Sequence, residues 1–170
     1  PILLVCDYKN GAWQTPEIVP YQNLEIAPSA RVFHYGQAIF EGMKAYKDDN
    51  GGIWLFRPEE NFKRFNVSSS RMAMPEVPEH VFFEGLKTLL KLESDWIKPG
   101  IGNSLYIRPF AIASHAGFIA SPADEFKFMV ICSPVQAYYG VQVRVKIAAK
   151  FSCAATGGFG FSQPPGNLAR

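Results

Sequence analysis

Residues 57–96 read RPEENFKRFNVSSSRMAMPEVPEHVFFEGLKTLLKLESDW, and the spacing of their apolar residues predicts two consecutive helices. The first helix is expected to begin at about Pro58, because proline suits the first position of a helix. The carboxylates of Glu59 and Glu60 then lie in the first turn, where they favour the positive end of the helix dipole. The apolar stripe of this helix is predicted to use Phe62, Phe65 and Met72.

The second helix is expected over residues 79–96, after Pro75 and Pro78 have ended the first one. Pro99 and Gly100 are expected to end it in turn. Its apolar residues at near-helical spacing are Val81, Phe82, Leu86, Leu89, Leu90 and Trp96.

Short strands are expected on both sides of the two helices. The strands expected before the helices cover residues 2–8, 43–47 and 53–56, with turns at 9–11 and 48–52 and a loop over 14–31. The strands expected after the helices cover residues 104–113, 126–133 and 141–149, and the last of them alternates apolar and polar side chains. This order predicts an α+β fold, in which a mostly antiparallel sheet is flanked by two helices.

The composition excludes several classes of protein. A chain of 170 residues with 48% hydrophobic and 19% charged residues is ordinary for a globular domain, and a net charge of +2 without basic runs argues against nucleic acid as partner. No apolar run approaches the ~20 residues of a membrane span, and the apolar start lacks the basic flank of a signal peptide. The three cysteines, Cys6, Cys132 and Cys153, are scattered and form neither a metal site nor a disulfide framework. We therefore expect a cytoplasmic protein.

One string of residues points to a family. Residues 33–42 read FHYGQAIFEG and continue into MKAY. Taken singly, His34 is a structural histidine and Tyr35 a core side chain with a bonded hydroxyl. Taken as one string, the residues resemble the branched-chain amino acid aminotransferases, which belong to the class IV pyridoxal-phosphate enzymes. The resemblance runs from about Asp7 to Asn167, and it implies the fold of the N-terminal domain of the fold-type IV enzymes.

The resemblance implies a cofactor contact at Arg64, on the first predicted helix. The family carries there an arginine that binds the phosphate of pyridoxal 5′-phosphate. A guanidinium matches a phosphate dianion in a bidentate manner, so the chemistry is suitable. Without the family, Arg64 is read as a surface residue on a solvated helix face.

Substrate contacts are implied at several aromatic and basic residues. Tyr106 and Arg108 are two apart on a predicted strand, so they project from one face, within a Tyr-Ile-Arg-Pro string like that of the family. A phenol and a guanidinium suit a substrate carboxylate, while a simple aromatic–arginine stack is the alternative. The resemblance adds Tyr35, an apolar wall at Phe40 and a further tyrosine at Tyr138.

The last segment departs from the family pattern. The lysine that holds the cofactor as a Schiff base is expected at position 163, and this chain has Gln163, whose carboxamide cannot form an imine. The family tyrosine that follows Asn167 aligns with Leu168, and the family arginine upstream aligns with Cys153. Two other lysines on one predicted strand face are weaker candidates for the amine: Lys146 and Lys150.

The resemblance divides the chain into residues 1–150, the small N-terminal domain, and 151–170, a truncated interdomain and cofactor-loop segment. The C-terminal domain of the family is absent. Three explanations for the departures stand open: a fragment with an unreliable C-terminal stretch, an inactive relative, or a deliberate replacement of the lysine. We favour the fragment, with Arg170 as the truncation point.

The leading functional prediction is transamination of leucine, isoleucine or valine with 2-oxoglutarate by a homodimer, with no metal. A D-amino acid aminotransferase or an aminodeoxychorismate lyase shares the fold. The alternative from another class is an inactive chain that acts as a cofactor-binding or interaction module, and Gln163 and Leu168 favour it.

Overall fold

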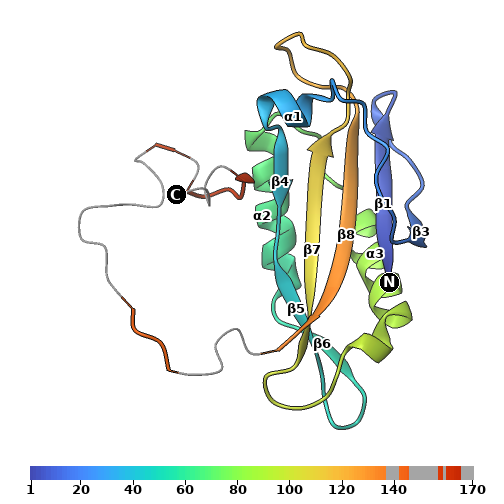
Figure 1. Ribbon diagram of the computed structural model, residues 1–170, viewed down its shortest axis with the longest axis vertical. Helices are drawn as coiled ribbons and strands as arrows, with labels where there is room; N and C mark the ends of the chain where they lie inside the picture. Colours follow the sequence, from blue (N-terminus) through green and yellow to red (C-terminus); the bar gives the residue numbers. More distant parts are fainter. Residues whose placement is uncertain (137–141, 146–156, 159, 166–170) are drawn as a thin grey trace.

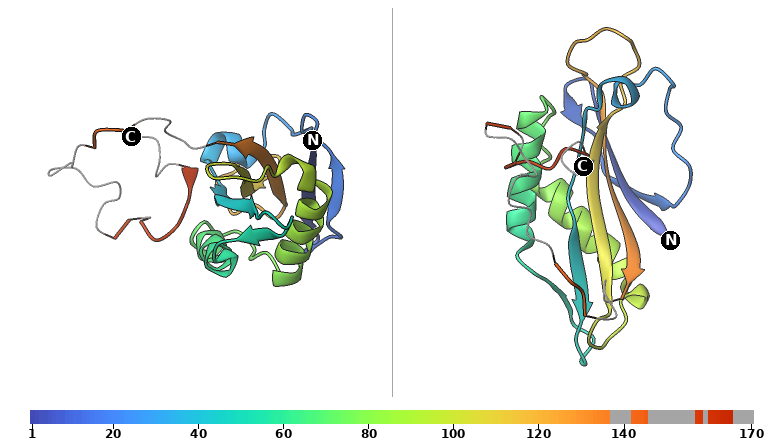
Figure 2. Two further views of the ribbon diagram at one scale, coloured as in Figure 1. Left: turned by 90° about the horizontal axis from the view of Figure 1, so that it is seen from below. Right: turned by 60° about the vertical axis from the view of Figure 1, so that its left-hand side comes forward.

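The protein is an antiparallel sheet with two helices packed on one face (Figures 1 and 2). The computed structural model describes residues 1–136, 142–145, 157–158 and 160–165. The strands are β1 (Ile2–Lys9), β2 (Ala12–Trp13), β3 (Glu17–Pro20), β4 (Ala38–Phe40), β5 (Met43–Lys47), β6 (Ile53–Leu55), β7 (Ser104–Ala113) and β8 (Phe126–Val135). The helices are α1 (Arg31–Tyr35), α2 (Pro58–Arg71), α3 (Glu79–Leu92) and the 3-10 turn η1 (Ser94–Trp96).

The strands follow the order β2-β1-β8-β7-β5-β6, with β3 paired to β1 and β4 paired to β7. All these strand pairs are antiparallel, which confirms the α+β prediction. No helix in the described part of the chain combines the length and apolar character that crossing a membrane requires.

The core lies between the inner face of the sheet and the helices α2 and α3. Phe65 of α2 and Phe82 of α3 both contact Phe128 of β8, with ring centroids 5.5 and 5.9 Å apart. All three side chains are buried. Because Leu4 and Cys6 pair with β8 on the same face, the apolar face of each helix is covered. The predicted helix stripe at Phe65 and Phe82 is therefore confirmed.

The outer face of the sheet, opposite the helices, carries three of the predicted substrate residues, Phe40, Tyr106 and Arg108. Strand register places Phe40 beside Phe110, and Lys44 beside Tyr106, while Ile131 lies beside Arg108. Successive side chains of a strand alternate between faces, so these residues share the outer face.

Several boundaries differ from the sequence prediction. The second helix ends at Leu92 instead of residue 96, because the buried Glu93 accepts a hydrogen bond from the Ile2 N–H at 2.9 Å, and Trp96 is exposed. Part of the predicted loop 14–31 is the edge strand β3, where prolines are tolerated. Residues 142–145 form no strand, so the prediction of a strand over 141–149 is wrong there, and its other residues lie outside the described part.

Candidate active-site wall

A buried carboxylate lies where the turn between β4 and β5 meets α2. Glu41 is fully buried, and its oxygens accept hydrogen bonds from Arg64 Nε and Nη2 at 2.5 and 2.9 Å. Asn61, one helical turn before Arg64, donates from Nδ2 at 2.8 Å, and the Gly42 N–H donates at 3.3 Å. The sequence interpretation missed Glu41 and Asn61, although a glutamate inside an apolar string signals a buried partner of opposite charge.

Arg64 presents two different edges. One edge faces Glu41, while 47% of the side chain remains exposed. The hydrogen bond that Arg64 donates to Glu41 raises the pKa of Arg64 above its ordinary value, so the guanidinium stays charged. Its third nitrogen, Nη1, has no partner within the described residues. The arginine is thus held from behind and offers its open edge to an anion.

Phe40, Tyr106 and Arg108 meet on the outer face of the sheet. The Arg108 guanidinium lies over the Phe40 ring, 4.6 Å from its centroid, and Nη2 donates to Tyr106 Oη at 2.6 Å. Arg108 Nε is buried without a hydrogen-bond partner in the described part of the chain. An apolar cavity of about 490 Å³ opens here, lined by Ala38, Ile39, Phe40, Arg108, Phe110, Ile112, Ile131 and Pro165. This cavity joins apolar walls to a cation, a combination that suits a ligand with an apolar body and an anionic group.

Glycine at position 42 permits this arrangement. A Cβ atom built on Gly42 would stand 2.5 Å from Tyr106 Oη. Tyr106 therefore reaches the end of β4 only because residue 42 has no side chain, and its hydroxyl can accept the bond from Arg108.

Arg64, Phe40, Tyr106 and Arg108 together form what we call the candidate wall. The position expected for the Schiff-base lysine lies beside it. The Gln163 N–H donates to Ser68 Oγ on α2 at 2.9 Å, and the Phe40 N–H donates to the Gln163 carbonyl at 3.2 Å. Two residues further on, Pro165 lines the cavity of Phe40 and Arg108. The segment 160–165, red in Figure 1, thus lies beside α2 and β4.

Other predicted site residues lie apart from this wall. Tyr35 donates from its hydroxyl to the Phe118 carbonyl and lines a different cavity, with Arg71 and Ala73. Its substrate role stays a prediction. The predictions for Tyr138, Cys153, Leu168, Lys146 and Lys150 fall outside the described residues.

The wall fits one end of pyridoxal phosphate. The open, charged edge of Arg64 suits the phosphate group, since a guanidinium forms two parallel bonds with such an anion. The other end does not fit, because Gln163 supplies no amine. Among the described residues, no cluster of His, Cys, Asp or Glu can hold a metal ion. Burial raises the pKa of Cys6 to about 11 and that of Cys132 to about 12, so both thiols stay protonated.

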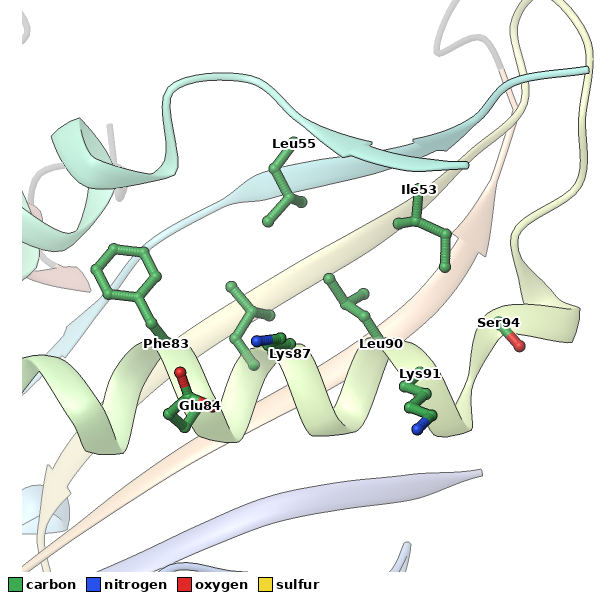
Figure 3. A pocket seen from close by; sticks show the side chains of 9 residues that line it. Ile53, Leu55, Phe83, Glu84, Lys87, Leu90, Lys91 and Ser94 are labelled. Atoms are coloured by element: carbon green, nitrogen blue, oxygen red, sulfur yellow. The ribbon is translucent and has the colours of Figure 1, made fainter. Parts of the chain in front are cut away.

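A second groove, between α3 and β6, contains none of the predicted site residues. Figure 3 shows Ile53 and Leu55 of β6 facing Phe83 and Leu90 of α3, and the groove encloses about 460 Å³. It lies on the helix side of the sheet, away from the outer face that carries Phe40 and Arg108.

Comparison with curated proteins identifies relatives over nearly the whole chain. No family model matches the chain. Branched-chain-amino-acid transaminase 1 of Bacillus subtilis is 44% identical over 98% of this chain and 48% of its own length. A probable branched-chain-amino-acid aminotransferase of Staphylococcus aureus (strain N315) is 45% identical over the same shares. The chain thus spans about half the length of the curated relatives it matches.

Solved structures agree as well. The T.th. branched-chain amino acid aminotransferase with pyridoxamine 5′-phosphate is 28% identical, with a TM-score of 0.57 over 79% of this chain and 41% of that one. The enzyme from Escherichia coli, at 21% identity and the same TM-score and coverage, shows the fold alone. With the strings FHYGQAIFEG and Tyr-Ile-Arg-Pro, these relationships confirm the resemblance. The chain belongs to the branched-chain amino acid aminotransferase family and spans about half the length of the relatives quoted above.

Proposed function

We propose that this chain forms one wall of the active site of a pyridoxal-phosphate-dependent transaminase for leucine, isoleucine and valine, with 2-oxoglutarate as the amino acceptor. One observation carries the proposal. Arg64 of α2, the cavity of Phe40 and Arg108, and position 163 come from separate parts of the sequence. Hydrogen bonds connect Arg64 to Glu41, next to Phe40, and connect residue 163 to both Ser68 of α2 and Phe40 of β4.

Each residue has a distinct part in this proposal. Pyridoxal phosphate, when bound, supplies the electron sink that transamination needs. Arg64 binds the phosphate, and Glu41 keeps its guanidinium in place. Phe40 and its neighbours exclude water from the substrate side chain, while Arg108 and Tyr106 bind the carboxylate. By the family resemblance we also assign substrate contacts to Tyr138 and to Tyr35, although Tyr35 lines a different cavity in this chain.

Gln163 favours a second candidate, a chain that binds the cofactor without catalysing transamination. A carboxamide neither condenses with an aldehyde nor accepts a proton at neutral pH. Both candidates place the cofactor phosphate on Arg64. They differ in what Gln163→Lys does in a full-length context. The first candidate predicts that this variant forms glutamate from leucine and 2-oxoglutarate, and the second predicts that it does not.

The phosphate site is tested with pyridoxamine 5′-phosphate and pyridoxamine, which have no aldehyde and so do not label lysines. By calorimetry, we expect the phosphorylated compound to bind at least about tenfold more tightly. Arg64→Lys should remove that difference, because an ammonium cannot replace the fork, whereas Lys63→Ala on the same helix should retain it. Equal binding of both compounds to all three proteins contradicts the proposal.

We further propose a homodimer located in the cytoplasm. The free thiols of Cys6 and Cys132 are consistent with a reducing compartment. The dimer rests on the family resemblance and on an exposed apolar end of the molecule, which includes Phe118 and Ile119.

A further inference from the structure

One face of α2 contacts two parts of the proposed cofactor site, the Glu41 carboxylate beside Arg64 and the segment that carries residue 163. Asn61, Arg64 and Ser68 follow one another at helical spacing, so they lie on the same face. Asn61 and Arg64 bind Glu41, as described above. Ser68, one turn later, binds the segment that carries residue 163.

Ser68 makes two hydrogen bonds with one hydroxyl. The side chain is fully buried, and Oγ donates to the Arg64 carbonyl at 2.8 Å while it accepts from the Gln163 N–H at 2.9 Å. A hydroxyl carries one hydrogen and two lone pairs, so the two bonds are compatible. The donated bond fixes the orientation of the hydroxyl, so a lone pair points at residue 163.

The neighbours of residue 163 are anchored too. The Gln163 carbonyl accepts the bond from the Phe40 N–H at 3.2 Å, and Ser162 is buried. Phe161 lines a hollow on α2 with Phe62, and Pro165 lines the cavity of Arg108. The backbone of this segment is therefore held against both elements that form the proposed site, although its side chain at position 163 departs from the family.

We infer that Ser68 is a positioning residue, which fixes the backbone of residue 163 relative to the phosphate-binding Arg64. The inference rests on the proposed binding of pyridoxal phosphate at Arg64. Because the Ser68 hydroxyl joins the Arg64 carbonyl to the residue 163 amide, any side chain at position 163 starts at a set distance from the phosphate. The backbone anchor of residue 163 is thus present in this chain, although its side chain carries no amine.

The first arm of the test needs no cofactor. Hydrogen exchange of the Gln163 amide, followed by NMR in the 170-residue chain, should be about five- to tenfold faster in Ser68→Ala, since one hydrogen bond is lost. Ser69→Ala is the matched control. Ser69 is equally buried and donates to the carbonyl four residues before it, but it bonds nothing in the described segment 160–165.

The second arm measures the position of the side chain. Gln163→Lys is incubated with substoichiometric pyridoxal phosphate, and the amine condenses with the aldehyde with loss of water. Borohydride then delivers hydride to the carbon of the C=N bond and leaves a secondary amine, which peptide mass mapping locates. We expect residue 163 to be the main labelled site, with labelling lowered about five- to tenfold by added Ser68→Ala and unchanged by added Ser69→Ala.

The outcomes separate the inference from the proposed function. Unchanged exchange of the Gln163 amide in Ser68→Ala overturns the inference, whatever the cofactor does. Equal effects of the Ser68 and Ser69 variants overturn it as well, because the role is then merely structural. If pyridoxamine 5′-phosphate binds through Arg64 but Gln163→Lys is not labelled, the inference fails, while the phosphate site of the proposed function stands. If Arg64 binds no phosphate, the proposed function fails, and the exchange experiment still decides whether Ser68 holds residue 163.

Discussion

At the scale of single residues, the Glu41 carboxylate stabilises the fold as well as the proposed site. Four donors surround its two oxygens in a place without solvent access. Glu41→Gln replaces an oxygen acceptor by a donor group that faces other donors. We expect it to lower the free energy of unfolding by about 2–3 kcal/mol, as measured by urea denaturation.

Glu60→Gln is the matched control for this variant. Glu60 pairs with Lys63 at 2.9 Å on the exposed side of the same helix. Exposed pairs contribute little, so no measurable change is expected. Equal stability of the Glu41 and Glu60 variants would show that the buried pair does not stabilise the fold.

The family resemblance, and not the residue types alone, predicted some residues of the proposed site and missed others. Four of the predicted residues stand in strings that resemble the family and lie on α2, β4 and β7: Arg64, Phe40, Tyr106 and Arg108. Ser68 was not predicted, because its partner lies 95 positions further along the chain. A serine inside a helix commonly bonds only its own backbone, so its sequence context gives no signal for a long-range role.

At the scale of elements, α3 packs on β1 through a glycine. A Cβ atom built on Gly85 would stand 2.5 Å from Leu4 Cδ2, inside the core. Alanine favours a helix over glycine by about 1 kcal/mol, but overpacking a core costs about 1–3 kcal/mol. Gly85→Ala should therefore destabilise the protein in urea denaturation.

A double variant tests the cause. Leu4→Val removes the atoms that Gly85→Ala would contact. The destabilisation of Gly85→Ala/Leu4→Val should be smaller than the sum of the two single effects. Additive effects would mean that the contact between α3 and β1 is not the reason.

The pairing of β1 with β8 predicts how stability depends on pH. Asp7 lies opposite Lys127 across the two strands and bonds both Lys127 and Lys9. Partial burial alone would raise the pKa of Asp7, but the bonds from the two ammonium groups outweigh it and hold the pKa below its ordinary value. The stabilisation is thus present above the ordinary pKa of about 4 and is lost as the pH falls through the lower folded value.

Asp7→Asn should therefore weaken the protein at neutral pH and flatten the acid limb of a plot of unfolding free energy against pH. The exposed Asp95 provides the control, and Asp95→Asn should retain that limb. The same acid limb in Asp7→Asn and in the unchanged protein would exclude the pair as its cause.

The accuracy of the element predictions follows from what stabilises each element. The strands over 43–47 and 104–113 were predicted at their observed bounds, and β1 to within one residue, because turn residues bound these runs in the sequence. The short elements β3, β4 and α1 were missed. They are stabilised by pairing with β1 or β7 and by contacts with the 114–125 loop, which local sequence does not reveal.

At the scale of the whole molecule, one end presents an apolar surface suited to a second copy of the chain. Phe33, Phe118 and Ile119 are 63%, 70% and 74% exposed. The rings of His34 and Phe118 stand 5.1 Å apart, and the Tyr35 hydroxyl bonds the Phe118 carbonyl, so α1 and the 114–125 loop form one surface. An exposed apolar patch that includes two phenylalanines favours association.

We expect the chain to form dimers in sedimentation velocity at increasing concentration, and Ile119→Lys to weaken the association by at least about tenfold, because a charge would be buried without a partner. Ile101→Lys is the matched control. Ile101 is also open to solvent but belongs to the loop between η1 and β7. Figure 1 shows this loop at the opposite end of the sheet from α1. Equal weakening by both variants would assign the association to general surface hydrophobicity. Monomers at all concentrations would remove the dimer from the proposal, and the wall formed by Arg64, Phe40 and Arg108 would then have to function within a single chain.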